Sequence, residues 1–139
     1  MRRQDIVDAA REELGTTWRH QARVPGVAVD CLGLVVVTAH KLGLEPEDCT
    51  TYRRVPDPVR LHEMTSKQLV PADKHAPKPG TILLLRFEGR NTHPYHFAIV
   101  TGPDTMIHGY AVARKVVEED IHRWLPQVVR AYDFPGVID

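Results

Sequence analysis

The chain has 139 residues, a length that fits one domain with a single core. Apolar residues make up 42% of it and charged residues 26%, which is typical of a globular domain. Lysine plus arginine and aspartate plus glutamate both number 18, so the formal net charge is zero. This balance gives no electrostatic reason to expect nucleic acid or an anionic membrane as a partner. We expect one domain over residues 1–139.

The sequence predicts neither membrane insertion nor an export signal. No apolar stretch approaches the ~20 residues that a helix needs to span a bilayer, and the longest, residues 32–39, is interrupted by Gly33. The N-terminus begins basic, turns acidic at Asp5 and has no apolar region of the kind found in signal peptides. Two cysteines, Cys31 and Cys49, are too few for a disulfide framework, so we expect both to be reduced thiols.

The first half of the chain predicts helices. Apolar residues at helical spacing put Ile6 and Leu14 on one face of the first helix. Asp30 stands at the N-cap of the second helix and Gly43 follows its end. The apolar residues of this second helix lie on several faces, which indicates a central, buried helix. The expected helices are 4–14, 31–42 and 58–69, with loops over 15–29, 45–57 and 71–79.

The second half predicts antiparallel strands. Short apolar and β-branched runs alternate with turn residues, among them the sequence Gly-Pro-Asp at 102–104. The expected strands are 81–87, 96–101, 105–108, 112–118 and 128–134, with a helical turn over 120–125. Helices followed by antiparallel strands indicate an α+β fold.

Cys31 has the setting of a nucleophile. It falls in the first turn of the second helix, where the helix dipole and the backbone N–H groups favour an anion and lower the pKa of a thiol. Gly33, two residues later, leaves space where a substrate backbone could approach. The alternative is a buried structural cysteine, because free cysteines are among the most buried residues.

Two histidines can supply the base and its orienting partner. His96 begins one apolar strand and His108 ends the next, across the turn at 102–104. A hairpin of this length brings both imidazoles to neighbouring strands on the same face, so that one ring takes the thiol proton while the other fixes its tautomer. The alternative for each histidine alone is a satisfied polar residue at a sheet edge.

A zinc site is an alternative use of these histidines that the sequence disfavours. His93 lies three residues before His96, and with His108 the two could suggest ligands. Pro94 between them breaks helical spacing, and no cysteine or carboxylate completes a familiar set. We expect no metal.

Trp18 lies in the loop before the nucleophile helix. There it could form a wall of the cleft and shield the thiolate from water, or it could anchor the loop to the core.

These motifs resemble the NlpC/P-sixty family of cell-wall cysteine peptidases. Residues 30–35 read Asp-Cys-Leu-Gly-Leu-Val at a helix start, and residues 96–102 read His-Phe-Ala-Ile-Val-Thr-Gly, with His108 beyond them. Four further segments are similar to the branch found in phage tails and gene transfer agents, so the resemblance covers nearly the whole chain. They are Gly-Thr-Thr-Trp-Arg-His-Gln at 15–21, Arg-Val-Pro-Asp-Pro at 54–58, Lys-Pro-Gly at 78–80 and Tyr-Asp-Phe-Pro-Gly at 132–136.

The resemblance implies a circularly permuted papain-like α+β fold, with N-terminal helices, a central helix that carries the nucleophile, and an antiparallel sheet. It implies Cys31 as nucleophile, His96 as base and His108 as the orienting residue. It implies hydrolysis of peptidoglycan stem peptides, often between D-glutamate and a diamino acid, without a metal or organic cofactor. Trp18, Asp30 and Gly33 are the residues that we expect at the substrate.

One position departs from the family pattern. The family commonly has a tyrosine before the nucleophile, with its hydroxyl toward the cysteine, where this chain has Trp18. An indole offers an N–H donor but no hydroxyl, and its larger size could narrow the cleft, alter specificity or lower activity.

The resemblance also implies a location. Peptidoglycan lies outside the cytoplasm, although the chain shows no export signal, and a virion tail would carry the enzyme to the cell wall. We therefore expect an enzyme made in the bacterial cytoplasm, bound to phage tail hub or baseplate proteins. The alternatives are a structural tail-tip component that keeps the peptidase fold with little activity, and a related acyltransferase or amidase acting on other substrates.

Overall fold

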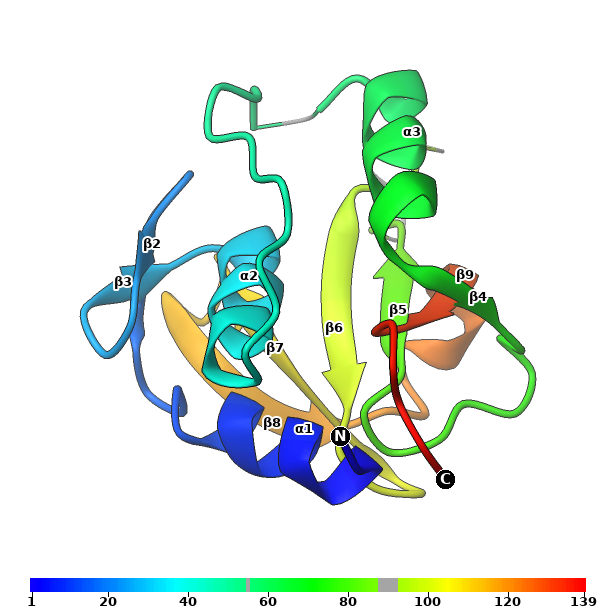
Figure 1. Cartoon of the computed structure of the whole chain (residues 1–139). Coiled ribbons are helices and arrows are strands. Elements are labelled where there is room, and N and C mark those ends of the chain that lie inside the picture. The colour runs from blue at the N-terminus through cyan, green and yellow to red at the C-terminus, as the bar shows by residue number, and fades with distance from the viewer. Residues whose placement is uncertain (55, 88–92) are drawn as a thin grey trace.

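A computed structural model describes residues 1–54, 56–87 and 93–139 (Figure 1). Helices α1 (Arg3–Arg11), α2 (Cys31–Lys41) and α3 (Pro58–Gln68) precede most of the strands, and a 3-10 turn, η1 (Leu125–Gln127), precedes the last one. Within the described ranges, no helix is long and apolar enough to cross a membrane. The strands are β1 (Thr17–Trp18), β2 (Arg23–Val24), β3 (Ala28–Val29), β4 (Val70–Ala72), β5 (Ile82–Leu85), β6 (His96–Val100), β7 (Thr105–Tyr110), β8 (Lys115–Asp120) and β9 (Val128–Asp133).

These strands form one sheet in the order β2-β3-β1-β8-β7-β6-β5-β9-β4. Neighbours are antiparallel except for β1 and β3, which run parallel. Figure 1 shows α2 lying against the middle of the sheet, α1 crossing below it, and α3 standing apart on the other side of β6. The two termini lie close together, joined by a bridge between Arg2 and Ile138. The α+β fold expected from the sequence is confirmed.

Alternation along the central strands builds two cores. Leu84, Phe97 and Ile107 face one way and pack with α2, whereas Leu83, Ala98 and Met106 face the other way and pack with Trp124. Neighbouring positions on a strand project to opposite faces, which is why each of these strands is apolar throughout.

Helix α2 is the centre of the first core. Residues 32–39 are all buried, as the multi-face apolar pattern predicted. Asp30 caps the helix by accepting the N–H of Gly33 at 2.7 Å, and Gly43, with a φ of +81°, follows its end. The predicted bounds of α2 and α3 are confirmed to within one residue.

Several short elements differ from the sequence prediction. Leu14 was expected on the buried face of the first helix, but α1 ends at Arg11 and Leu14 is 46% exposed. The predicted loop 15–29 contains β1, β2 and β3, and the predicted loop 71–79 begins within β4. Strand β8 covers 115–120 rather than 112–118, and the predicted helical turn over 120–125 shares only its last residue with η1. Strands of two or three residues are defined by their pairing with segments distant in sequence, such as Thr17 with Lys115. Local sequence therefore does not predict them.

A glycine in β7 sets how closely α2 approaches the sheet. A Cβ placed on Gly109 would lie 2.9 Å from the carbonyl oxygen of Asp30 and 3.2 Å from the backbone nitrogen of Cys31. These are backbone atoms, which cannot rotate away as the end of a side chain can. Strand β7, which carries His108, therefore contacts the backbone of Cys31, the predicted nucleophile.

Replacing Gly109 with alanine should displace the start of α2. We expect Gly109→Ala to lower the free energy of unfolding by about 1–3 kcal/mol, the usual cost of overpacking, measured by urea denaturation. Gly102→Ala is the matched control, because its Cβ would meet only the Thr105 hydroxyl at 3.2 Å. Equal stability of the two variants would contradict a close contact at Gly109.

Candidate functional site

His96 and His108 form a buried pair. The Nε2 atom of His96 lies 2.7 Å from Nδ1 of His108, and the two residues are 2% and 0% exposed. They come from adjacent strands, since β6 and β7 pair through Ile99 with Ile107 and Val100 with Met106. The prediction that the hairpin places both imidazoles on the same face is confirmed.

The carboxylate of Glu119, which the sequence did not predict as part of the site, contacts His108. Oε2 of Glu119 lies 3.1 Å from Nε2 of His108, and Oε1 accepts the indole N–H of Trp124 at 2.8 Å. Glu119 lies in β8, which pairs with β7, and alternation from Val117 opposite His108 carries it to the same face. The strand predicted from the sequence ended at residue 118 and so did not include Glu119.

Aromatic rings enclose the imidazole pair. The Phe87 ring lies 4.7 Å from that of His96, and the Tyr110 ring stacks at 4.7 Å on His108. Trp124 contacts His108 edge-on at 5.2 Å. Burial lowers the pKa of His96 well below its ordinary value, and His108 nearby adds to that effect. Burial also lowers the pKa of His108, although Glu119 opposes this. Both rings are therefore neutral at physiological pH.

Cys31 lies beside the backbone that flanks His96. It is the first residue of α2, and its Sγ is 3.9 Å from the carbonyl oxygen of Tyr95. Burial raises the pKa of the Cys31 thiol to about 12, with the negative charge of Asp30 adding to the rise. Hydrogen bonding with the backbone of Phe97 and Leu32 opposes it. The sequence led us to expect a lowered pKa; in this resting geometry the cost of burial outweighs the helix terminus.

Asp30 is an anchor for the loop in front of α2. Its Oδ1 accepts the N–H of Gly33 at 2.7 Å and Nη1–H of Arg23 at 3.0 Å. Its Oδ2 accepts the N–H of Gln21 at 2.8 Å and the hydroxyl of Tyr52. The residue is 3% exposed. With both oxygens engaged by the protein, its carboxylate orders the site, and the sequence-based expectation that it binds substrate stays a prediction.

The surroundings of Gly33 differ from the sequence prediction. We expected a substrate backbone to approach it, but a Cβ there would lie only 2.2 Å from the carbonyl oxygen of Ala22. The space beside Gly33 is filled by this chain's own loop, so the glycine is required for packing of the loop against α2.

Cys31, His96 and Trp18 line one cavity of about 1400 Å³. The guanidinium of Arg54 lies over the Trp18 ring, 5.0 Å from its centre, and the indole forms part of the cavity wall, one of the two roles that the sequence left open. Val55, within the family-like segment 54–58, lies outside the described residues.

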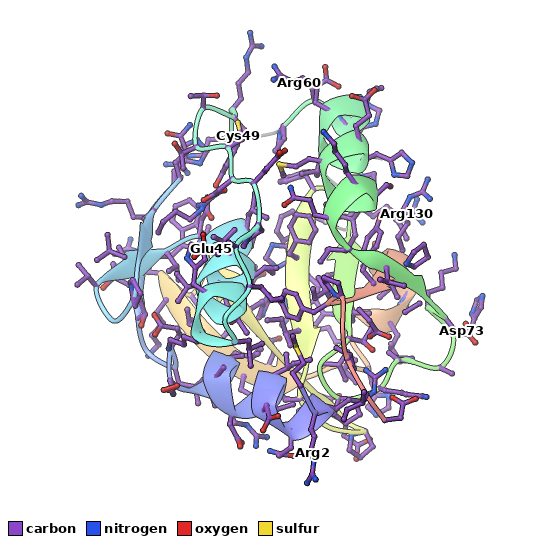
Figure 2. All side chains as sticks on the ribbon, in the orientation of Figure 1. Arg2, Glu45, Cys49, Arg60, Asp73 and Arg130 are labelled. Atoms are coloured by element: carbon purple, nitrogen blue, oxygen red, sulfur yellow. The ribbon has the colours of Figure 1, made fainter. Side chains whose placement is uncertain are left out.

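The far end of this cavity is built by the segment before α3 and by α3 itself. Cys49, Arg53 and Arg60 contribute to its lining. Figure 2 shows Cys49 and Arg60 at the same end of the molecule, on the loop above α2 and on α3. Exposed charges of both signs line this part of the cavity, because Glu47 and Glu63 lie on it together with the arginines.

The zinc alternative finds no ligand set in the part of the chain that the structure describes. There, no group of three or more histidine, cysteine, aspartate or glutamate side chains is arranged to hold a metal ion. Glu119 and His108 instead pair with each other and with Trp124 and His96.

Known structures share this fold. The chain superposes on NlpC1 from Trichomonas vaginalis with a TM-score of 0.73 and 17% identity, covering 95% of this chain and 44% of that one. It superposes on an NlpC/P-sixty family protein from Bacillus cereus with a TM-score of 0.72 and 18% identity, covering 95% and 40%. With the NlpC/P-sixty domain of the peptidoglycan hydrolase SagA the TM-score is 0.67 at 20% identity, covering 95% and 98%. No protein-family model matches the chain, and no curated protein sequence matches it.

These superpositions show the papain-like fold of NlpC/P-sixty domains, as the sequence resemblance implied. The chain spans less than half the length of the first two proteins and nearly all of the SagA domain. At identities of 17–20%, the likeness is one of fold, and the chemistry rests on the residues of this chain.

The two cysteines should react differently with iodoacetamide. A hydrogen bond with Thr51 lowers the pKa of Cys49, whereas that of Cys31 is raised to about 12. Because alkylation requires the thiolate, we expect Cys49 to be labelled first near about pH 7 and the rate at Cys31 to keep rising beyond about pH 9. Peptide-resolved mass spectrometry measures both rates. A Cys31 rate that levels off below about pH 7 would show a preformed thiolate–imidazolium pair and contradict this description of the resting site.

Proposed function

We propose that this chain is a cysteine peptidase that cleaves the stem peptides of peptidoglycan. The observation that carries the proposal is the placement of Cys31 and His96 on one cavity, with His108 buried 2.7 Å from His96. The fold is one that the peptidoglycan hydrolase SagA also has. A thiol at a helix start and an oriented imidazole on the same cavity are the groups that thiol acyl transfer requires.

The reaction that follows from this geometry is acyl transfer. His96 removes the thiol proton as Cys31 attacks the scissile carbonyl, which converts two neutral groups into an ion pair and avoids a lone buried charge. The backbone N–H of Cys31, at the positive end of α2, holds the developing oxyanion. His96 then protonates the leaving amine, and a water activated by the same ring releases the acyl group. A turn of the Cys31 side chain from the Tyr95 carbonyl toward the imidazole begins the sequence.

We further propose that the bond joins D-glutamate to a diamino acid. Stem peptides carry free carboxylates, and Arg53, Arg54 and Arg60 lie on the cavity lining. The same lining also carries Glu47, Asp48, Asp57 and Glu63, of which Asp48 pairs with Arg23 at 2.8 Å and Asp57 caps α3. The arginines are the groups of this mixed lining that would bind the carboxylates of a stem peptide.

Mass spectrometry of purified diaminopimelate-type muropeptides tests the function. We expect wild type to cleave the D-glutamyl bond and Cys31→Ala to lose at least about 10³-fold in rate, because the nucleophile is gone. Cys49→Ala is the matched control and should still cleave.

A Cys31→Ala variant that retained more than about a tenth of wild-type activity would contradict Cys31 as the nucleophile. No cleavage of muropeptides by wild type, together with Cys31-dependent turnover of another acyl or amide substrate, would indicate an acyltransferase or amidase. No turnover of any of these substrates would favour a structural component.

We propose a phage tail or phage-like particle as the location, with tail hub or baseplate proteins as partners. The support is the similarity of residues 15–21, 54–58, 78–80 and 132–136 to the tail-associated branch. Proteomic analysis of purified particles should find the chain at a fixed copy number. Its absence from particles that contain the other tail proteins would contradict this placement.

A further inference from the structure

We propose that Glu119 is a positioning residue that fixes which nitrogens of His108 and His96 carry protons. The inference rests on the proposed peptidase function, in which His96 accepts the thiol proton. It extends the expected three-residue constellation by a fourth side chain, which acts through the histidines without touching the substrate.

Glu119 presents an acceptor to His108. Hydrogen bonds from Trp124 and His108 hold the pKa of this carboxyl below its ordinary value, although burial alone would raise it. An ionised carboxylate has no proton to donate. Its Oε1 accepts the indole N–H of Trp124 at 2.8 Å and lies 3.4 Å from Nη1 of Arg123. Its Oε2, 3.1 Å from Nε2 of His108, therefore requires that nitrogen to carry a proton.

The proton positions of both rings follow from that requirement. A neutral imidazole has one N–H, so with the proton on Nε2 the Nδ1 atom of His108 is an acceptor. Nε2 of His96, 2.7 Å away, must then donate to it. This leaves the lone pair of His96 on Nδ1, the other side of the ring. That atom is the one available to take a proton from Cys31.

Without the carboxylate, the same geometry allows the reverse arrangement. His108 could carry its proton on Nδ1 and donate to Nε2 of His96, which would then hold its own proton on Nδ1. A ring in that state cannot accept the thiol proton, although every distance is unchanged. Glu119 and Arg123 act on the pKa of His108, and the phenol ring of Tyr110 stacks on it. Of these three groups, only Glu119 hydrogen-bonds to a histidine nitrogen in the described structure.

Glu119→Gln tests this assignment of the protons on His96 and His108. Trp124 can only donate, so the amide oxygen should stay on the Trp124 side and the amide N–H₂ should face His108. That donor forces His108 to accept at Nε2, which selects the reversed tautomers. We expect kcat for muropeptide cleavage to fall between about 10-fold and about 10⁴-fold, the range spanned by lost supporting carboxylates and by a wrong tautomer.

Glu118→Gln is the matched control. Glu118 precedes Glu119 in β8 and pairs with Arg11 of α1 at 2.8 Å, on the opposite face of the sheet. It undergoes the same chemical change and loses an ion pair, so it reports the effect on stability alone. Glu119→Asp keeps an acceptor-only group with a shorter reach and should restore part of the activity.

Two measurements distinguish a change in the histidine tautomers from a general loss of structure. Histidine ¹⁵N NMR of the folded protein should show Nε2–H on both rings in wild type and Nδ1–H on both in Glu119→Gln. Alkylation of Cys31, referenced to Cys49 in the same sample, should be slower in Glu119→Gln near about pH 7 and approach wild type above about pH 10, where hydroxide removes the thiol proton without His96.

Wild-type tautomers in Glu119→Gln, or kcat and Cys31 alkylation within about twofold of Glu118→Gln, would overturn the proposal. The NMR and alkylation results do not depend on the substrate. If wild type cleaves no muropeptide while these readouts change as described, the peptidase assignment fails and the role of Glu119 stands.

Discussion

The contact between Gly109 and the start of α2 is the constraint on which the site depends. Only a residue without a Cβ lets the backbone of Asp30 and Cys31 rest on β7. The same strand carries His108 one position earlier, so helix approach and histidine placement are set by two neighbouring residues. The strand alternation that turns Gly109 toward α2 turns His108 toward the aromatic residues on the other face.

Buried polar groups around this contact are all accounted for. Within the described ranges, no buried side-chain nitrogen or oxygen lacks a hydrogen-bond partner. Asp30 orders the loop in front of the helix, and Glu119 completes the histidine pair from behind. An unpaired buried polar group costs about 1–3 kcal/mol, so these contacts hold the side chains in single arrangements. Rigidity of this kind is what a site needs if a proton is to move between two fixed atoms.

Burial also shapes the chemistry of the resting site. Aromatic rings and apolar strands keep His96 and His108 neutral, and they keep the Cys31 thiol protonated. Transfer of one proton between Cys31 and His96 adds no net charge to this environment. The proposed mechanism therefore starts from a neutral thiol and a neutral imidazole rather than from a thiolate at the helix terminus.

Local signals in the sequence were sufficient for the main parts of the site. Asp30 and Gly43 marked the ends of α2, and the spacing of His96 and His108 across a turn predicted their contact. Glu119 was missed because its contact depends on the register of β7 with β8, which lies outside local pattern. The environment of Gly33 and the raised pKa of Cys31 depend on segments distant in sequence, so they required the folded structure.

Detection of an acyl-enzyme tests whether Cys31 is the nucleophile. Wild-type protein is mixed with muropeptide, quenched in acid within one turnover and digested, and the Cys31 peptide is analysed by mass spectrometry. We expect a transient thioester on Cys31 whose added mass equals that of the N-terminal fragment of the cleaved stem peptide less one water. Cleavage without any adduct at Cys31, and at an undiminished rate in Cys31→Ala, would contradict nucleophilic catalysis by this thiol.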